Sequence, residues 1–76
     1  MKRENKKIVK KIIANSIETS LSSIEDRSSS KDFPKWDSLA NVKIMLQLEK
    51  KFKIKVKSKD TSKLNKVSEI YKLIET

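Results

Sequence analysis

The chain has 76 residues, contains neither cysteine nor histidine, and carries a formal charge of +9 from 19 Lys and Arg residues against 10 Asp and Glu residues. This length allows a single domain (residues 1–76) with a thin hydrophobic core. The missing residue types exclude disulfides, thiolate nucleophiles and histidine-based acid–base or metal sites, so we predict a protein that is not an enzyme and has no catalytic residues or metal ligands. The charge favours anionic partners such as nucleic acid, lipid headgroups or acidic protein surfaces, unless the lysines are only solvated residues on exposed helix faces.

The first predicted element is an amphipathic helix from Glu4 to about Ile17. Its Ile and Val residues recur at helical spacing, and its lysines fall mostly on the other side. The apolar side has no Trp or Phe to anchor it in a membrane surface, which favours packing against the rest of the domain. No apolar run approaches the roughly 20 residues of a membrane-spanning helix, and the N-terminus lacks the apolar block of a secretion signal. We therefore expect a cytoplasmic protein.

A polar, serine-rich segment follows at about residues 19–35 and is predicted to form a long loop. Leu21, Ile24 and Phe33 are its large apolar side chains, and we expect all three to pin it to the domain. Pro34 disfavours helix at Phe33 and so helps to end the loop. A connection of this length is uncommon in a compact domain unless it has a function or is disordered.

The second predicted helix begins with Asp37 as its N-cap and Ser38 as its first residue, and it runs to about Lys51. Its apolar residues fall on two adjoining sides, with Ile44, Met45, Leu48 and Phe52 on one and Leu39, Val42 and Leu46 on the other. A polar ridge consists of Lys43, Gln47 and Lys50. Either neighbours flank this helix on two sides, or part of its apolar surface is left for partner proteins. Packing is the safer explanation for the first set, and for the second set both explanations stay open.

Residues 52–56 alternate apolar and basic side chains, but one such segment cannot form a sheet, so we predict an extended connector that buries its apolar residues. A short helical turn is expected at about residues 60–64, and Asn65 is predicted to cap a last helix. The apolar face of that helix consists of Val67, Ile70, Tyr71 and Ile74. The sequence therefore predicts an all-α fold, a small bundle of three main helices plus one short helix, with a long loop between the first and second helices.

A distinctive set of residues surrounds Ser38. The sequence Trp36-Asp37-Ser38-Leu39 stands at the start of the second predicted helix, and Leu48-Glu49 and Phe52 follow near its end. Together with the long preceding loop and the chain length, this pattern resembles the acyl carrier protein family over nearly the whole chain. The Asp-Ser-Leu triplet alone is weak evidence, and its combination with the other residues at this spacing is more specific.

The resemblance implies that Ser38 carries a 4'-phosphopantetheine arm, whose thiol holds an acyl or aminoacyl group as a thioester. The Trp-Asp-Ser-Leu form is similar to that of free-standing carriers in specialised biosynthesis. The arm would come from coenzyme A through a magnesium-dependent phosphopantetheinyl transferase, with Asp37 and Leu39 part of what that enzyme recognises. Other implied partners are a loading ligase and downstream transferases or synthases, visited by a monomeric carrier. The residues predicted to dock partners are Trp36, Val42, Lys43, Leu46 and Lys50.

Elementary chemistry at Ser38 agrees with this role. Unpaired N–H groups and the positive end of the helix dipole would stabilise an attached phosphate by typically about 0.3–1 kcal/mol per charge. Lys35 and Lys43 are close in sequence and would add positive charge. The alternative is that Ser38 is merely a tolerated first-turn serine beside its capping Asp37.

The charge of the second helix departs from the family pattern. Carriers of this family usually present carboxylates there, whereas Lys43, Lys50 and Lys51 stand at such positions in this chain, and only Asp37 and Glu49 keep the acidic pattern. A basic partner surface would meet like charge, so we expect partners that tolerate or complement a basic helix. The alternative function is that of a small basic helical nucleic-acid-binding protein. The overall charge favours it, but the scarcity of arginine and the single Trp disfavour it.

Overall fold

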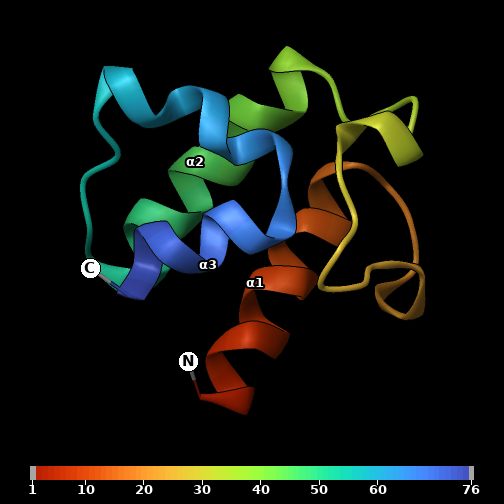
Figure 1. Cartoon of the computed structure of the whole chain (residues 1–76), viewed down its shortest axis with the longest axis horizontal. Coiled ribbons are helices and arrows are strands. Elements are labelled where there is room, and N and C mark those ends of the chain that lie inside the picture. Colours follow the sequence, from red (N-terminus) through yellow and green to blue (C-terminus); the bar gives the residue numbers. More distant parts are fainter. Residues whose placement is uncertain (1, 76) are drawn as a thin grey trace.

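The computed structural model describes residues 2–75, which form a helical bundle and confirm the predicted all-α class (Figure 1). The three main helices are α1 (Arg3–Ser16), α2 (Ser38–Phe52) and α3 (Val67–Glu75). Three short 3-10 segments join them, η1 (Leu21–Ser23), η2 (Ser30–Asp32) and η3 (Ser58–Asn65). Within residues 2–75 there is no β-strand, and no helix has both the length and the apolar character needed to cross a membrane.

The core lies where α1, α2 and α3 meet, because each helix turns one apolar stripe toward the other two. The side chains with the lowest exposure come from all three helices and from η3: Val9, Ile13, Ile44, Leu48, Leu64, Val67 and Ile70. Met45 and Phe52 of α2 are half-buried and pack against this cluster. The predicted packing side of the second helix is therefore confirmed.

Two helices end without glycine, which this sequence lacks entirely. After α1, Glu18 adopts a left-handed conformation with φ 56°, and the Thr19 N–H donates to the Ala14 carbonyl at 3.0 Å. After α2, Lys53 adopts the same conformation with φ 55°. Left-handed backbone of this kind allows a chain to leave a helix while its last carbonyls remain hydrogen-bonded.

The carboxylate of Glu49 fixes the chain that leaves α2. Its Oε2 accepts a hydrogen bond from the Val56 N–H at 2.8 Å. Residues 54–57 form neither helix nor strand, and their apolar side chains are half-buried while their lysines are exposed. The predicted connector is confirmed in part, because Phe52 belongs to α2 and the apolar side chains are half-buried and not fully buried. The connector lies at the left of Figure 1, opposite the long loop on the right.

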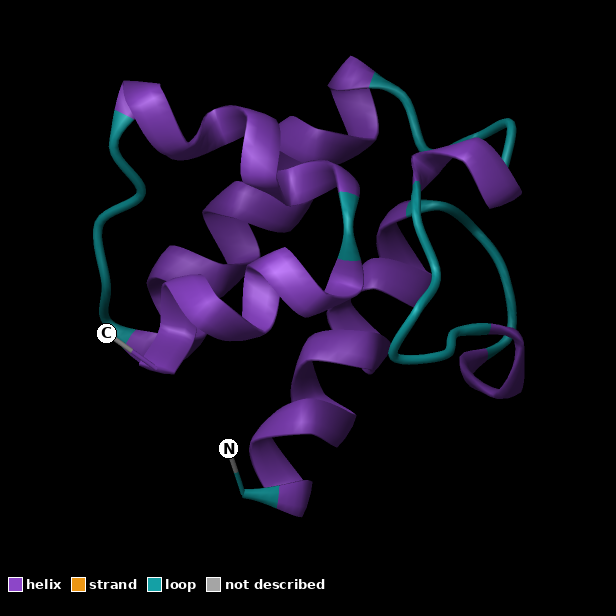
Figure 2. Cartoon of the chain, viewed as in Figure 1, coloured by secondary structure: helices purple, strands orange, loops and turns teal. Residues whose placement is uncertain are grey.

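The long loop is only partly as predicted. Ile24 is buried and Phe33 packs against the core, but Leu21 is 36% exposed and does not pin the loop. Backbone bonds take over that role, because the Val67 N–H donates to the Ser28 carbonyl at 3.1 Å and so ties the loop to the start of α3. Figure 2 shows the two short helical turns, η1 and η2, that interrupt this loop.

Asp26 also anchors the loop, through contacts to two helices. The Tyr71 hydroxyl of α3 donates to Asp26 Oδ1 at 2.7 Å, and Lys10 Nζ of α1 lies 3.1 Å from the same oxygen. The Tyr71 hydrogen bond and then the Lys10 contact lower the pKa of Asp26 below its ordinary value, whereas burial and the Asp26 hydrogen bond raise the pKa of Tyr71. Lys6 adds positive charge here, with its Nζ 5.4 Å from the centre of the Tyr71 ring.

We expect Asp26→Asn to remove a pH-dependent contribution to stability of at most about 1 kcal/mol, since the carboxylate is mostly exposed. A lowered folded-state pKa means that the contribution is fully present above the ordinary pKa of 3.8 and is lost as the pH falls through the lowered value. Urea unfolding from about pH 6 to about pH 2 should therefore show the wild type and the variant converging toward acid. A constant difference between the two proteins would contradict this assignment.

The segment before α3 differs from the prediction. The 3-10 segment η3 is longer than the expected turn, and Asn65 is its last residue, so the prediction that Asn65 caps the last helix is wrong. Its side-chain oxygen instead accepts a hydrogen bond from Asn41 Nδ2 at 2.7 Å. This contact joins η3 to the first turns of α2.

Candidate functional site

Ser38 is the first residue of α2, as predicted, and it is exposed. Asp37 precedes it as the N-cap, and its Oδ1 accepts a hydrogen bond from the Ala40 N–H at 3.0 Å. This cap satisfies one of the N–H groups that a helix start leaves unpaired. The Ser38 hydroxyl makes no hydrogen bond to any residue within 2–75, so it is accessible to a reagent or an enzyme.

Trp36 holds this helix start in place. Its side chain is only 3% exposed, and its indole Nε1–H donates both to Asn41 Oδ1 at 2.8 Å and to the Leu64 carbonyl at 3.1 Å. Its ring also contacts that of Phe33, with the ring centroids 6.3 Å apart. The prediction that Trp36 docks partners is therefore wrong, because a buried indole with its N–H already bonded presents no surface to a second protein.

The network around Trp36 includes Asn41, which was not predicted from the sequence, and Asn65, which was predicted to have a different role. Asn41 links the indole to Asn65, so the first turns of α2 are bonded to the end of η3. The available signal was the position of Asn41, a polar residue one turn after Asp37 on the side of the helix that faces the core. Its function here is to position the backbone on either side of Ser38.

The outer surface of α2 carries large apolar side chains that no neighbour covers. Leu39, Val42 and Leu46 are 64%, 47% and 56% exposed, respectively. Lys43 and Lys50 are exposed beside them. At 100° per residue these five side chains project within an arc of about 100°, and we call them the α2 outer face. Packing of a second neighbour against this side, one of the two explanations for the wide apolar arc, does not occur within residues 2–75.

The α2 outer face has different neighbours along its two edges. Toward α1, Gln47 is half-buried and its Nε2 donates to Ser16 Oγ at 3.0 Å, so the exposed polar ridge reduces to Lys43 and Lys50. Toward η3 lies a cleft of about 290 Å³. The cleft is lined by Ser38, Asn41, Val42, Met45, Thr61, Ser62 and Leu64. Ser38 therefore opens onto the η3 side of the helix.

Two lysines lie near the helix start, on the side that faces α1. Lys35 and Lys43 line a small cleft of about 140 Å³ together with Asp37 and Leu39. Lys35 Nζ lies 3.6 Å from Glu18 Oε1, whereas Lys43 has no ion-pair partner within the described chain. A phosphate on Ser38 would thus meet the positive end of the helix dipole, whereas Lys43 lies about 140° around the helix from Ser38, on the side that faces α1.

Residues 2–75 contain no cluster of three or more Asp or Glu side chains arranged to hold a metal ion. No protein-family model and no curated protein matches this sequence. The geometry of the site offers an accessible alcohol on a fixed, electropositive helix start beside an exposed apolar face, which suits covalent attachment of a phosphate-linked group.

Proposed function

We propose that this protein is a carrier that tethers an acyl or aminoacyl intermediate on 4'-phosphopantetheine attached to Ser38. The observation that supports the proposal best is the exposed, unbonded Ser38 hydroxyl on the first turn of a capped helix. The residues present fit the group, because the unpaired N–H groups and the positive dipole end of the helix start lie where its phosphate would be attached. The arm would supply a terminal thiol that holds the cargo as a thioester.

In the attachment reaction, the Ser38 hydroxyl loses its proton and its oxygen forms the new bond to the phosphorus of the pantetheine phosphate of coenzyme A. The diphosphate bond breaks, and the adenosine bisphosphate part leaves. Asp37 keeps the helix start capped, and Trp36 keeps it bonded to η3, so the hydroxyl is presented in one position. A phosphopantetheinyl transferase would provide the magnesium ion and the base.

The proposed carrier acts in the cytoplasm as a monomer, in fatty-acid or specialised biosynthesis, and forms no bond of its own. Its further partners are a loading ligase and downstream transferases or synthases. Tethering raises the concentration of the cargo at each docked active site, so a modest protein contact suffices. Leu39 and Asp37, which flank Ser38, are the residues that the transferase would contact first.

The proposal is tested by intact mass analysis of the protein isolated from its own cells. We expect one phosphopantetheine per chain, located on the peptide that contains Ser38. The same addition should follow incubation of the recombinant protein with coenzyme A, magnesium and a broad-specificity transferase. Protein isolated from active cells without any added group on Ser38 would contradict the proposal.

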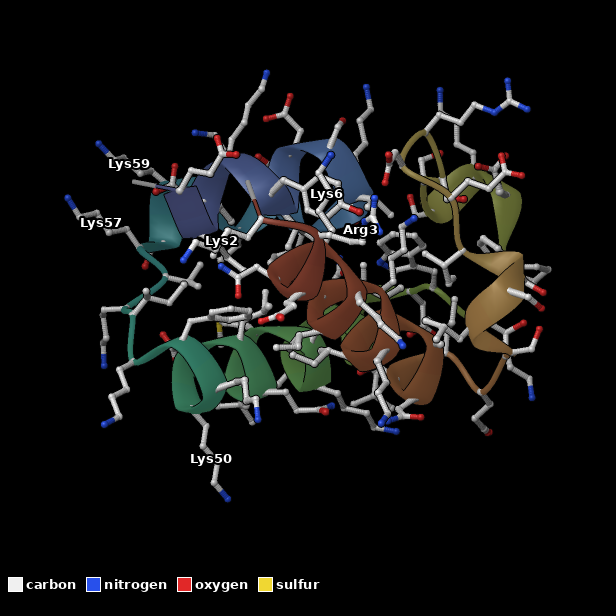
Figure 3. The ribbon with its side chains drawn as sticks, turned by 90° about the horizontal axis from the view of Figure 1, so that it is seen from below. Lys2, Arg3, Lys6, Lys50, Lys57 and Lys59 are labelled. Atoms are coloured by element: carbon white, nitrogen blue, oxygen red, sulfur yellow. The ribbon has the colours of Figure 1, made fainter. Side chains whose placement is uncertain are left out.

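A second candidate function, nucleic-acid binding, is supported by the lysines at the end of α2 and in the segment that follows it. Six of them are exposed and without an ion-pair partner in the described chain: Lys50, Lys51, Lys53, Lys55, Lys57 and Lys59. Figure 3 shows that the side chains of Lys50, Lys57 and Lys59 extend outward from the ribbon. Such a segment would bind phosphates without reading sequence, because it carries neither arginine nor an exposed aromatic residue.

If nucleic-acid binding is the function, affinity for single-stranded DNA should fall by about 300-fold between about 50 and 200 mM salt, as expected for six phosphate contacts to a single strand. Fluorescence anisotropy with a labelled oligonucleotide measures this dependence. A Lys53→Gln, Lys55→Gln, Lys57→Gln variant should bind less tightly and show a smaller salt dependence. Absence of binding at the lowest salt concentration would exclude this second function.

A further inference from the structure

The α2 outer face is asymmetric in a way that constrains what can dock on it. Relative to Leu39 at 0°, helical projection places Leu46 at about −20° and Val42 at about −60°, toward η3. The same projection places Lys50 at about +20° and Lys43 at about +40°, toward α1. The face therefore has an apolar half and a basic half, and Ser38 lies beyond the apolar half.

The charges on this face are not neutralised within the protein. Lys43 and Lys50 have no ion-pair partner in the described chain, and Figure 3 shows the Lys50 side chain extending from α2 into solvent. The two acidic residues of this region hydrogen-bond to backbone N–H groups, Asp37 to Ala40 and Glu49 to Val56. An approaching surface would meet two free cations about 10 Å apart along the helix axis.

We infer that the enzymes that act on Ser38 bind the α2 outer face through an apolar patch with carboxylates along one side. This inference rests on the proposed function. Leu39, Val42 and Leu46 contact the apolar patch, and Lys43 and Lys50 contact the carboxylates. Since Ser38 and the lysines lie on opposite sides of the apolar residues, the catalytic entrance of the partner lies across its apolar patch from its carboxylates.

Other occupants fit this face less well. A second copy of the chain, packed with the same face about a two-fold axis, would bring two sets of unpaired lysines together, and like charges in an interface are unfavourable. An anionic lipid surface would attract the lysines, but the face has no aromatic residue to anchor it at the headgroup level. A protein surface with carboxylates complements both halves.

The inference is tested by the initial rate at which Ser38 is labelled with fluorescent coenzyme A in a cleared lysate of the source organism. The test variant is Lys43→Glu, Lys50→Glu. The matched control is Lys7→Glu, Lys66→Glu, which changes the net charge equally at exposed lysines away from α2. We expect the test variant to be labelled at least about tenfold more slowly than the wild type, and the control to change less than about twofold.

Two further measurements separate the contribution of charge to the labelling rate from that of apolar contact. They are the salt dependence of labelling and the labelling rate of a variant with less apolar surface. The labelling rate of the wild type should fall as salt rises, because screening weakens an attraction between opposite charges. Leu46→Ser should lower the rate at every salt concentration without changing the salt dependence. Sedimentation with phosphatidylserine vesicles checks the lipid alternative, and we expect no binding that depends on Lys43 and Lys50 at physiological salt.

Each outcome has a distinct meaning. Three outcomes would overturn the inference and leave the carrier function standing. The test variant could be labelled as fast as the wild type, or the control could lose as much labelling rate as the test variant. Vesicle binding could also depend on Lys43 and Lys50 while the labelling rate does not. Absence of label from the wild-type protein would contradict the proposed function itself and this inference with it.

Discussion

Replacing Ser38 with alanine is expected to abolish attachment of phosphopantetheine while leaving the fold unchanged. The side chain is exposed and makes no hydrogen bond within the described residues, so its loss should change the free energy of unfolding by less than about 0.5 kcal/mol. The missing hydroxyl, in contrast, is the only atom through which the arm could be joined at this position. Intact mass after incubation with coenzyme A, magnesium and transferase measures attachment, and urea unfolding measures stability.

Ser62→Ala is the matched control for this experiment. Ser62 is exposed and lines the same cleft as Ser38, but it belongs to η3 and not to the start of an α-helix of full length. We expect this variant to be modified as fast as the wild type. The attachment site would be assigned to the wrong residue if Ser38→Ala were still modified. The same would hold if only Ser62→Ala failed to gain phosphopantetheine.

Replacing Trp36 with alanine is expected to lower the free energy of unfolding by about 3–5 kcal/mol, the usual cost of truncating a buried Trp or Phe. The loss combines a cavity beside the core with two acceptors, Asn41 Oδ1 and the Leu64 carbonyl, that lose their donor. A domain of this size has a total stability of roughly 4–11 kcal/mol, so much of the variant would be unfolded in mild denaturant. Circular dichroism is the suitable probe, because the only tryptophan of the chain is removed.

Trp36→Phe provides the comparison. It keeps most of the apolar volume and removes the indole N–H, so we expect a smaller loss of about 1–3 kcal/mol. If Trp36→Ala instead left stability nearly unchanged but slowed labelling of Ser38, Trp36 would belong to the docking surface after all. Comparison of the two variants thus separates cavity formation from the loss of hydrogen bonds.

The helices could be predicted from the sequence because their signals are local. The cap and first residue of α2 follow from Asp37 and Ser38 themselves, and the packing side of α2 follows from the spacing of its apolar residues. Exposure of Leu39, Val42 and Leu46 was one of two explanations for an apolar arc wider than one contact needs. Side-chain periodicity predicts which faces of a helix are apolar, but it does not show which of these faces another segment covers.

The residues that were wrongly assigned depend on partners far away in sequence. Trp36 is bonded to Leu64, 28 residues later, and Gln47 to Ser16, 31 residues earlier. Nothing near Trp36 or Gln47 indicates that these acceptors are within reach. The same holds for Asn65, a good capping residue by type, whose side chain is bonded to Asn41 instead.

The hydrogen bonds that join the start of α2 to η3 also determine how far the attachment point at Ser38 could move relative to the rest of the domain. Because Trp36 and Asn41 connect two segments of the bundle, the base of an attached arm would be stationary with respect to the whole domain. The space swept by the distal thiol would then depend on the rotatable bonds of the arm and on the orientation of the domain against each enzyme. Movement of the backbone at Ser38 would contribute little to this space. Differences in turnover between two partner enzymes would therefore reflect how each enzyme orients the domain.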